Sequence, residues 1–152
     1  MIKYIFLCIT FFVSNSYCQL PIKQCANGEN KPTYLDVVNC KEMPCTVVTG
    51  TTAVMYMNFT APELIDTLQA KILANVGGLN VPYPLPQPDA CKALSNTHCP
   101  LEVNEPAQYK LEMPILSIFP EIGVTLSLYL EANGVKDNKV VCCIIDIQVV
   151  KP

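Results

Sequence analysis

Cysteine and histidine are the residues whose chemistry is most easily inferred from their number and spacing in this chain. The 152 residues include nine cysteines and a single histidine, His98. Zinc sites usually take four ligands of these two types, and nucleophilic catalysis needs a base beside the nucleophile. His98 could complete a zinc set only if cysteines gave up other partners. These residue types favour disulfide bonding over a metal site or a catalytic site, and we expect neither metal nor cofactor.

The first eighteen residues predict that the chain is exported. They read MIKYIFLCITFFVSNSYC, with one lysine, an apolar run from Tyr4 to Val13, and then small polar residues. This pattern is typical of a secretory signal peptide cleaved after Cys18. The apolar run is short for a bilayer span, so a retained anchor is the weaker alternative. We expect a signal peptide at 1–18, one domain at 19–152, and a secreted protein, with the lysosomal lumen as the alternative location.

Seven cysteines follow the expected cleavage site, and export makes disulfides the expected state. Seven is an odd number, so one thiol is left over, and spacing alone leaves the pairing open. The seven are Cys25, Cys40, Cys45, Cys91, Cys99, Cys142 and Cys143.

Composition limits the partners that this chain can bind. Hydrophobic residues make up 51% and charged residues only 15%, which is a small charged share for a soluble surface. All ten basic residues are lysines and the formal net charge is −3. This charge argues against a nucleic-acid partner and against tight docking on anionic membranes.

Alternating apolar and polar residues predict the strands that must position these groups. The pattern has a period of two in 51–60, in 122–130 and in the final VVCCIIDIQVV, and 109–116 is a further strand interrupted by Pro114. EANGVKDNK contains Asn-Gly and suits a hairpin connection. Short strands with proline- and glycine-rich turns predict an all-β fold, an immunoglobulin-like sandwich of two antiparallel sheets.

Two segments are harder to assign. In 62–76, Leu64, Leu68, Ile72 and Val76 recur at a spacing of four, which by itself predicts a helix capped by Gly77 and Gly78. In VPYPLPQPD (81–89), every second residue is a proline. Prolines exclude a helix and a central strand there, so we expect an extended segment at a sheet edge or in a polyproline-like loop.

Taken together, the cysteines and prolines resemble a known family. Several segments of the chain are similar to motifs of the ML lipid-recognition domains. They are KQCANG, VVNCKEMPC with TVVTG, GGLNVPYPLPQPDACKALSNTHCPL, the prolines of EMPI and SIFPEIGV, and CCIIDIQVV. The closest similarity is to the small soluble Niemann–Pick type C cholesterol-transfer branch, and group two mite allergens are relatives. The matching motifs run across the whole of 19–152.

The resemblance implies features that the residues alone leave open. It implies the disulfides Cys25–Cys142, Cys40–Cys45 and Cys91–Cys99, which leaves Cys143 as a buried free thiol. It also implies a strand instead of a helix at 62–76. Relatives often carry tryptophan where Leu128 and Cys143 stand here, and this chain has none, so a larger or differently shaped cavity is expected.

The family's function implies an apolar ligand held between the two sheets. For any single residue, packing in a solid core is the alternative. The expected lining residues are Val37, Met55, Phe59, Ile72, Val76, Val81, Tyr83, Ile115, Phe119, Pro120, Ile122, Val124, Leu128 and Cys143. Within VPYPLPQPD, we expect Val81, Tyr83 and Leu85 to face the entrance of the cavity, as a stiff rim that loses little entropy when ligand binds. A rigid surface turn is the alternative.

The predicted function is a secreted carrier, not an enzyme, that binds a sterol or another small hydrophobic lipid and transports or presents it. Alternatives are a carrier of fatty acids or hydrophobic semiochemicals, and a β-sandwich interaction or immune co-receptor module without ligand. We expect a monomer that passes its ligand to a membrane receptor. Asn58-Phe59-Thr60 is an N-glycosylation acceptor, with Asn58 on the outward face of its strand.

Overall fold

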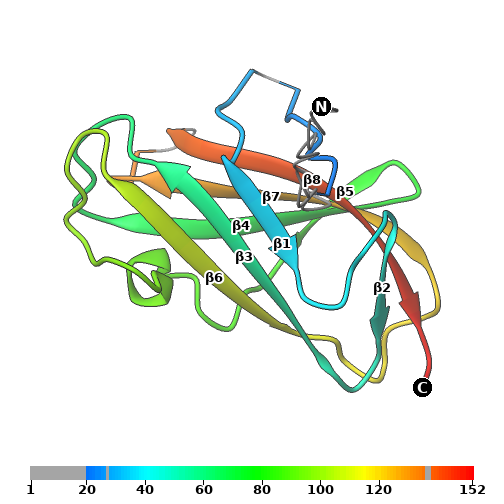
Figure 1. The fold of residues 1–152 in the computed structure, drawn as a ribbon. Coiled ribbons are helices and arrows are strands. Elements are labelled where there is room, and N and C mark those ends of the chain that lie inside the picture. The colour runs from blue at the N-terminus through cyan, green and yellow to red at the C-terminus, as the bar shows by residue number, and fades with distance from the viewer. Residues whose placement is uncertain (1–19, 27, 136–137) are drawn as a thin grey trace, which may run out of the picture.

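The computed structural model describes residues 20–26, 28–135 and 138–152, so the expected signal peptide lies outside the described residues. Within them, eight strands form two sheets that face each other (Figure 1). This arrangement confirms the all-β sandwich. The smaller sheet has the order β1 (Tyr34–Val37), β3 (Thr52–Thr60), β6 (Pro106–Pro114). The larger sheet has the order β2 (Cys45–Val48), β8 (Lys139–Val150), β7 (Gly123–Ala132), β4 (Leu68–Val76), β5 (Leu79–Tyr83).

One strand pair corrects the prediction that both sheets are antiparallel. β2 runs parallel to β8, with Cys45 opposite Ile147 and Val47 opposite Val149. A short hairpin forces its two strands to be antiparallel, but β2 is an edge strand and is not joined by a hairpin to its sheet neighbour β8. The chain crosses from the smaller to the larger sheet between β1 and β2, so tertiary packing sets the direction of β2. A short 3₁₀ helix at Ala90–Ala93 was also not predicted.

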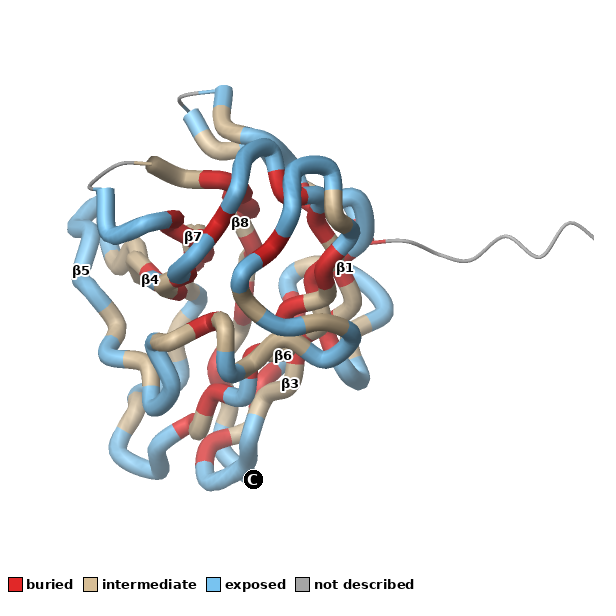
Figure 2. The backbone as a smooth tube through the Cα atoms, turned by 90° about the vertical axis from the view of Figure 1, so that its left-hand side faces the viewer, coloured by how far each residue is buried: buried red, intermediate tan, exposed pale blue. Residues whose placement is uncertain are grey.

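The predicted alternation holds in the long strands. On β3, Met55, Met57 and Phe59 are buried, and the residues between them are only partly buried. β7 and β8 show the same period, and their apolar faces meet those of β3 and β6. Figure 2 shows the buried stretches gathered where the two sheets face each other, with the loops exposed around them. The core therefore lies between the sheets, as the pattern predicts.

The helix suggested by the residue spacing at 62–76 is wrong, and the strand implied by the family resemblance is right. β4 buries Leu68, Ala70 and Ile72 in strict alternation. A spacing of four fits a strand as well as a helix, because four is also a multiple of two. Gly77 and Gly78 both have positive φ and form the two-residue turn from β4 to β5, where glycine carries no steric penalty.

The proline-rich segment begins as an edge strand and continues as a loop. β5 pairs with β4 alone, with Pro82 opposite Leu73 and Tyr83 opposite Ile72. Proline is tolerated there because one side of an edge strand needs no ladder hydrogen bonds. After Tyr83 the segment leaves the sheet and leads into the 3₁₀ helix. Both expected conformations, sheet edge and loop, are therefore present.

The disulfides follow the pairing that the resemblance implies: Cys25–Cys142, Cys40–Cys45 and Cys91–Cys99. The first ties the N-terminal segment to β8 across a sequence separation of 117 residues. Cys143 is a buried free thiol, and burial raises its pKa to about 12. It acts as a small apolar side chain rather than a nucleophile. In the part of the chain described, no helix has the length and apolar character needed to cross a membrane.

Candidate functional site

An apolar cavity of about 200 Å³ opens between the two sheets, and no polar surface lines it. We call this space the outer chamber. Its walls come from β4–β8 and from the segment 115–122 that joins β6 to β7. The lining residues are Ala74, Val76, Tyr83, Met113, Ile115, Phe119, Pro120, Ile122, Val124, Leu126, Ile147 and Val149. An apolar ligand bound in such a space is stabilised by desolvation, whereas a charged ligand finds no polar partner there.

Two aromatic side chains from separate segments meet at this cavity. The rings of Tyr83 and Phe119 make an edge-to-face contact, with centroids 6.3 Å apart. The Tyr83 hydroxyl donates a hydrogen bond to the carbonyl oxygen of Pro114, 3.1 Å away, and desolvation raises the pKa of Tyr83 above its usual 10.0. The edge strand β5 is thereby joined to the end of β6. An offset aromatic contact of this kind stabilises by about 0.5–1.5 kcal/mol beyond the area it buries.

The C-terminus holds the segment that carries Phe119. The Lys151 ammonium donates to the carbonyl oxygens of Ser117 and Phe119, at 2.7 Å and 2.8 Å. The Lys151 amide also donates to the Glu121 carboxylate, at 3.3 Å. These bonds lie outside the chamber. They satisfy backbone groups of a loop from which Ile115, Phe119 and Ile122 reach the chamber, whereas Leu116 and Ile118 are exposed.

A second apolar space, of about 40 Å³, adjoins the outer chamber on the side of β1 and β2. We call it the inner chamber. It shares Met113, Leu126 and Ile147 with the outer chamber, so these three side chains form the wall between the two spaces. The inner chamber reaches β1 at Val37 and β3 at Met55.

The structure distributes the predicted lining residues over four environments. Seven line the outer chamber: Val76, Tyr83, Ile115, Phe119, Pro120, Ile122 and Val124. Val37 and Met55 line the inner chamber. Ile72, Leu128 and Cys143 lie in the packed core and line neither chamber, so the smaller residues at the tryptophan positions do not widen the described cavities. Phe59 is buried beside a surface depression formed with the N-terminal segment.

The three residues of the predicted rim, Val81, Tyr83 and Leu85, also lie in different environments. Val81 is 51% exposed and does not line the outer chamber, although its pairing with Ala74 puts it on the same sheet face. Tyr83 lines the cavity. Leu85 is partly buried against the core. β5 is the edge strand of the larger sheet, and its inward face is partly exposed at Val81.

Five residues that line the outer chamber were missing from the predicted set: Ala74, Met113, Leu126, Ile147 and Val149. Alternation places each of them on an inward face, so a signal was present. Alternation does not say how deep in the sandwich a residue lies. That depth depends on the register between strands and on which layers are filled.

Larger depressions lie on the surface, and one of about 530 Å³ runs between β6 and residues 86–95. Charged side chains, among them Lys92, Lys110 and Glu112, contribute to its lining. An apolar ligand would gain less there than in the outer chamber, because part of the surface it would cover prefers water. The smaller, wholly apolar space is therefore the better candidate site.

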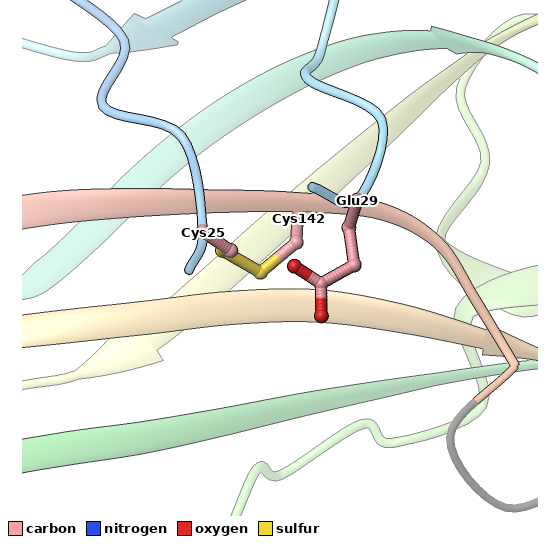
Figure 3. Close-up of side chains that lie close together, drawn as sticks. All are labelled: Cys25, Glu29 and Cys142. Atoms are coloured by element: carbon pink, nitrogen blue, oxygen red, sulfur yellow. A yellow bond between two sulfur atoms is a disulfide. The ribbon is translucent and has the colours of Figure 1, made fainter. Parts of the chain in front are cut away.

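Metal-binding residue types meet at one point, but two of them are already cross-linked. Ligand atoms of Cys25, Glu29 and Cys142 lie within 4.8 Å of one another. Figure 3 shows the two sulfurs joined as a disulfide with the Glu29 carboxylate beside them. Glu29 accepts from the Lys139 ammonium at 3.2 Å, and that ammonium lies 4.8 Å from the centre of the Tyr129 ring. The group is a structural clamp on the N-terminal segment, since disulfide sulfurs are not metal-binding thiolates.

Comparison with known proteins places this geometry in a family context. The model of the ML domain family matches residues 19–149. The Danio rerio protein named NPC intracellular cholesterol transporter 2 is 28% identical over 122 residues, covering 79% of this chain and 80% of its own. The Drosophila melanogaster protein named NPC intracellular cholesterol transporter 2 homolog a is 27% identical over 114 residues, covering 74% and 76%.

Solved structures agree on the fold. The crystal structure of a Niemann-Pick type C2 protein from Japanese carpenter ant superposes with a TM-score of 0.75 at 21% identity. The match covers 86% of this chain and 99% of the ant protein. The family model, the relatives and this superposition each span most of the chain, in agreement with the motifs in the sequence. The chain therefore belongs to the ML domain family.

Proposed function

We propose that this protein is a carrier that binds a sterol or another small hydrophobic lipid in the outer chamber and transports or presents it. The observation that carries the proposal is a cavity between the sheets with no polar lining. The names of the matched relatives, which describe cholesterol transporters, support the same class of ligand. Fatty acids and hydrophobic semiochemicals share the chemistry that this cavity selects.

Desolvation alone is sufficient for moderate affinity. Burying about 350 Å² of apolar ligand surface at about 25 cal/mol/Å² contributes roughly 9 kcal/mol. Association costs at least about 4 kcal/mol, which leaves at most about 5 kcal/mol and a dissociation constant of roughly 0.3 mM or weaker. Tighter binding requires a larger buried area. Moderate affinity suits a carrier, which must also release its ligand.

We propose no catalytic role. Among the described residues, the free thiol of Cys143 is buried with a raised pKa, and His98 is exposed beside the disulfide-bonded Cys99. Neither is placed to act as an activated nucleophile or as its base. The lining of the outer chamber holds no carboxylate and no imidazole.

The decisive experiment is to purify the exported protein under native conditions, extract it with organic solvent and identify the extracted molecules by mass spectrometry. We expect a sterol, a fatty acid or another small lipid in molar proportion to protein. We also expect a hydrophobic fluorescent probe to bind the delipidated protein. Repeated absence of both would favour the alternative of an interaction module without ligand.

A pair of variants locates the binding. Phe119→Asp places a charge in the lining of the outer chamber, and we expect at least a tenfold loss of probe affinity because a charge disfavours apolar contact. Val103→Asp is the matched control. Val103 is 54% exposed, lies past the far end of β3 and lines neither chamber. Equal affinity in the two variants would remove the outer chamber from the proposal.

We further propose that the chain is exported, acts as a monomer and passes its ligand to a membrane receptor. The signal pattern at 1–18 and the three disulfides support export. Asn58 lies on the outward face of β3, where its side-chain oxygen accepts a hydrogen bond from Gln108 at 2.9 Å. Peptide mass analysis before and after glycosidase treatment of the secreted protein tests whether Asn58 carries a glycan.

A further inference from the structure

The wall between the two chambers consists of three side chains that line both spaces, and we call them the shared layer. Along β6 and the residue that follows it, Leu111 lines the inner chamber but not the outer one, Met113 lines both, and Ile115 lines the outer chamber but not the inner one. Along β8, Ile145, Ile147 and Val149 follow the same order. Leu126 of β7 completes the shared layer. The chambers are therefore successive levels of one gap, separated by three side chains that come from both sheets.

Met113 is the member of this layer that can move most easily. Leu126 and Ile147 are branched, and both lie on neighbouring central strands of the larger sheet, where Leu126 is opposite Ile145 and Ile147 is opposite Val124. Met113 lies on the edge strand β6 of the smaller sheet and is unbranched. A thioether chain with three rotatable bonds adapts its shape at little cost. On the larger sheet, across the gap from Met113, Leu126 is paired with Ala74, a small residue on β4.

The chamber volumes indicate that such movement is needed for large ligands. The outer chamber holds about 200 Å³, which is below the roughly 300–1,000 Å³ of typical small-molecule sites. The segments around it are tied by the Tyr83–Pro114 and Lys151 hydrogen bonds. The inner chamber is the adjoining apolar space, and displacing the Met113 side chain would join the two.

We infer that Met113 determines specificity by limiting ligand length. With Met113 in the wall, the site holds a short ligand in the outer chamber. A long acyl chain or a sterol displaces the thioether and extends towards Val37 and Met55 in the inner chamber. The inference rests on the proposed function, since it concerns the same cavity, and it assigns to Met113 the choice between short and long members of the hydrophobic ligand class.

The test compares octanoic acid, stearic acid and cholesterol in displacing a fluorescent probe from delipidated protein. Met113→Phe puts a bulky ring in the wall. We expect the affinities for stearic acid and cholesterol to fall about tenfold more than the affinity for octanoic acid. Met113→Ile keeps a similar volume but removes the flexibility, so it should show the same selective loss if Met113→Phe folds poorly. Met113→Ala should shift the preference towards the long ligands.

Met57→Leu is the matched control, because Met57 is a fully buried methionine on the neighbouring strand that lines neither chamber. Its ligand preference should equal that of the unchanged protein. An independent measurement is the NMR signal of the methyl group of Met55, which lines only the inner chamber and should shift with stearic acid and stay in place with octanoic acid. If the Met113 variants keep the original ratio of long to short affinities, the inference is wrong while the carrier proposal stands. If the unchanged protein binds no ligand at all, the carrier proposal fails first.

Discussion

The two ends of the sandwich are built from the same apolar alternation, yet one is solid and the other hollow. In the solid part, Met57 of β3 lies opposite Tyr109 of β6, while Leu128 lies opposite Cys143 on the facing sheet, and all four are almost fully buried. In the hollow part, the inward-facing residues include Ala74, Val124 and Met113. The summed side-chain volume of each level, rather than its hydrophobicity, decides whether a cavity remains.

The ends also differ in how the chain closes them. At the solid end, the N-terminal segment crosses β8 and is held there by Cys25–Cys142 and by the Glu29–Lys139 pair. At the hollow end, the edge strand β5 meets the segment 115–122 through the Tyr83–Phe119 contact and β6 through one hydrogen bond to Pro114, while Lys151 holds the carbonyl oxygen of Phe119. A carrier needs this difference, because the end that admits ligand must open while the rest of the core stays folded.

The largest expected effect comes from cutting the covalent clamp at the solid end. Replacing Cys25 and Cys142 together by serine should lower the free energy of unfolding by about 2–5 kcal/mol, since a long loop in the unfolded chain is released. The Cys40→Ser, Cys45→Ser double variant is the comparison. Its loop closes over only five residues of separation, so its loss should be smaller. Chemical denaturation measures both. A larger loss in the comparison variant would contradict the assignment of the clamp to the solid end.

The next effect compares truncation to alanine at the two ends. Leu128→Ala removes a side chain that is 1% exposed in a filled level, and it should destabilise by about 2–5 kcal/mol through the cavity that it creates. Val124→Ala at the outer chamber should cost about 1 kcal/mol, because its neighbours already face empty space. Thermal and chemical unfolding check the order. Equal losses would show that the outer chamber is filled in solution.

The smallest effect concerns pH, which should act on the outer face of the larger sheet and not on the cavity. Asp146 has a lowered pKa, because it accepts hydrogen bonds from Lys23 and from the Thr125 hydroxyl at 2.8 Å. Because the pKa of Asp146 in the folded state lies below its unfolded pKa near 3.8, the ionised carboxylate stabilises the fold at pH values above the unfolded pKa. This stabilisation is lost as the pH falls through the folded-state pKa. Asp146→Asn should therefore flatten the loss of stability in acid.

Cholesterol binding should be independent of pH over the same acid range, since the cavity lining contains no acidic group. The pKa of Tyr83 is raised above 10.0, so the phenol also stays neutral through neutral pH. A titration of binding against pH with the Asp146→Asn variant alongside tests this separation. A change in affinity that follows the Asp146 titration would contradict it.

The sequence by itself determined the long strands, their inward faces and the family, but not the short strands β1 and β2. Period-two alternation specifies a half-buried strand wherever it is long enough, as in 122–130, and the cysteine and proline motifs specified the family and its disulfide pairing. The same reasoning left 62–76 ambiguous, because a spacing of four residues is compatible with both a helix and a strand. The proline-rich stretch was limited to an edge or a loop by covalent geometry alone, and the structure contains both.

Only the tertiary structure decided where the inward faces leave space. Ile72, Leu128 and Cys143 share the inward orientation of Val124 and Ile115, but strand register places them in levels that large side chains fill. The parallel direction of β2 and the wall at Met113 are likewise set by contacts between segments distant in sequence. The physical reason is that alternation specifies a direction for each side chain, whereas a cavity depends on the sum of volumes that several strands bring to the same level.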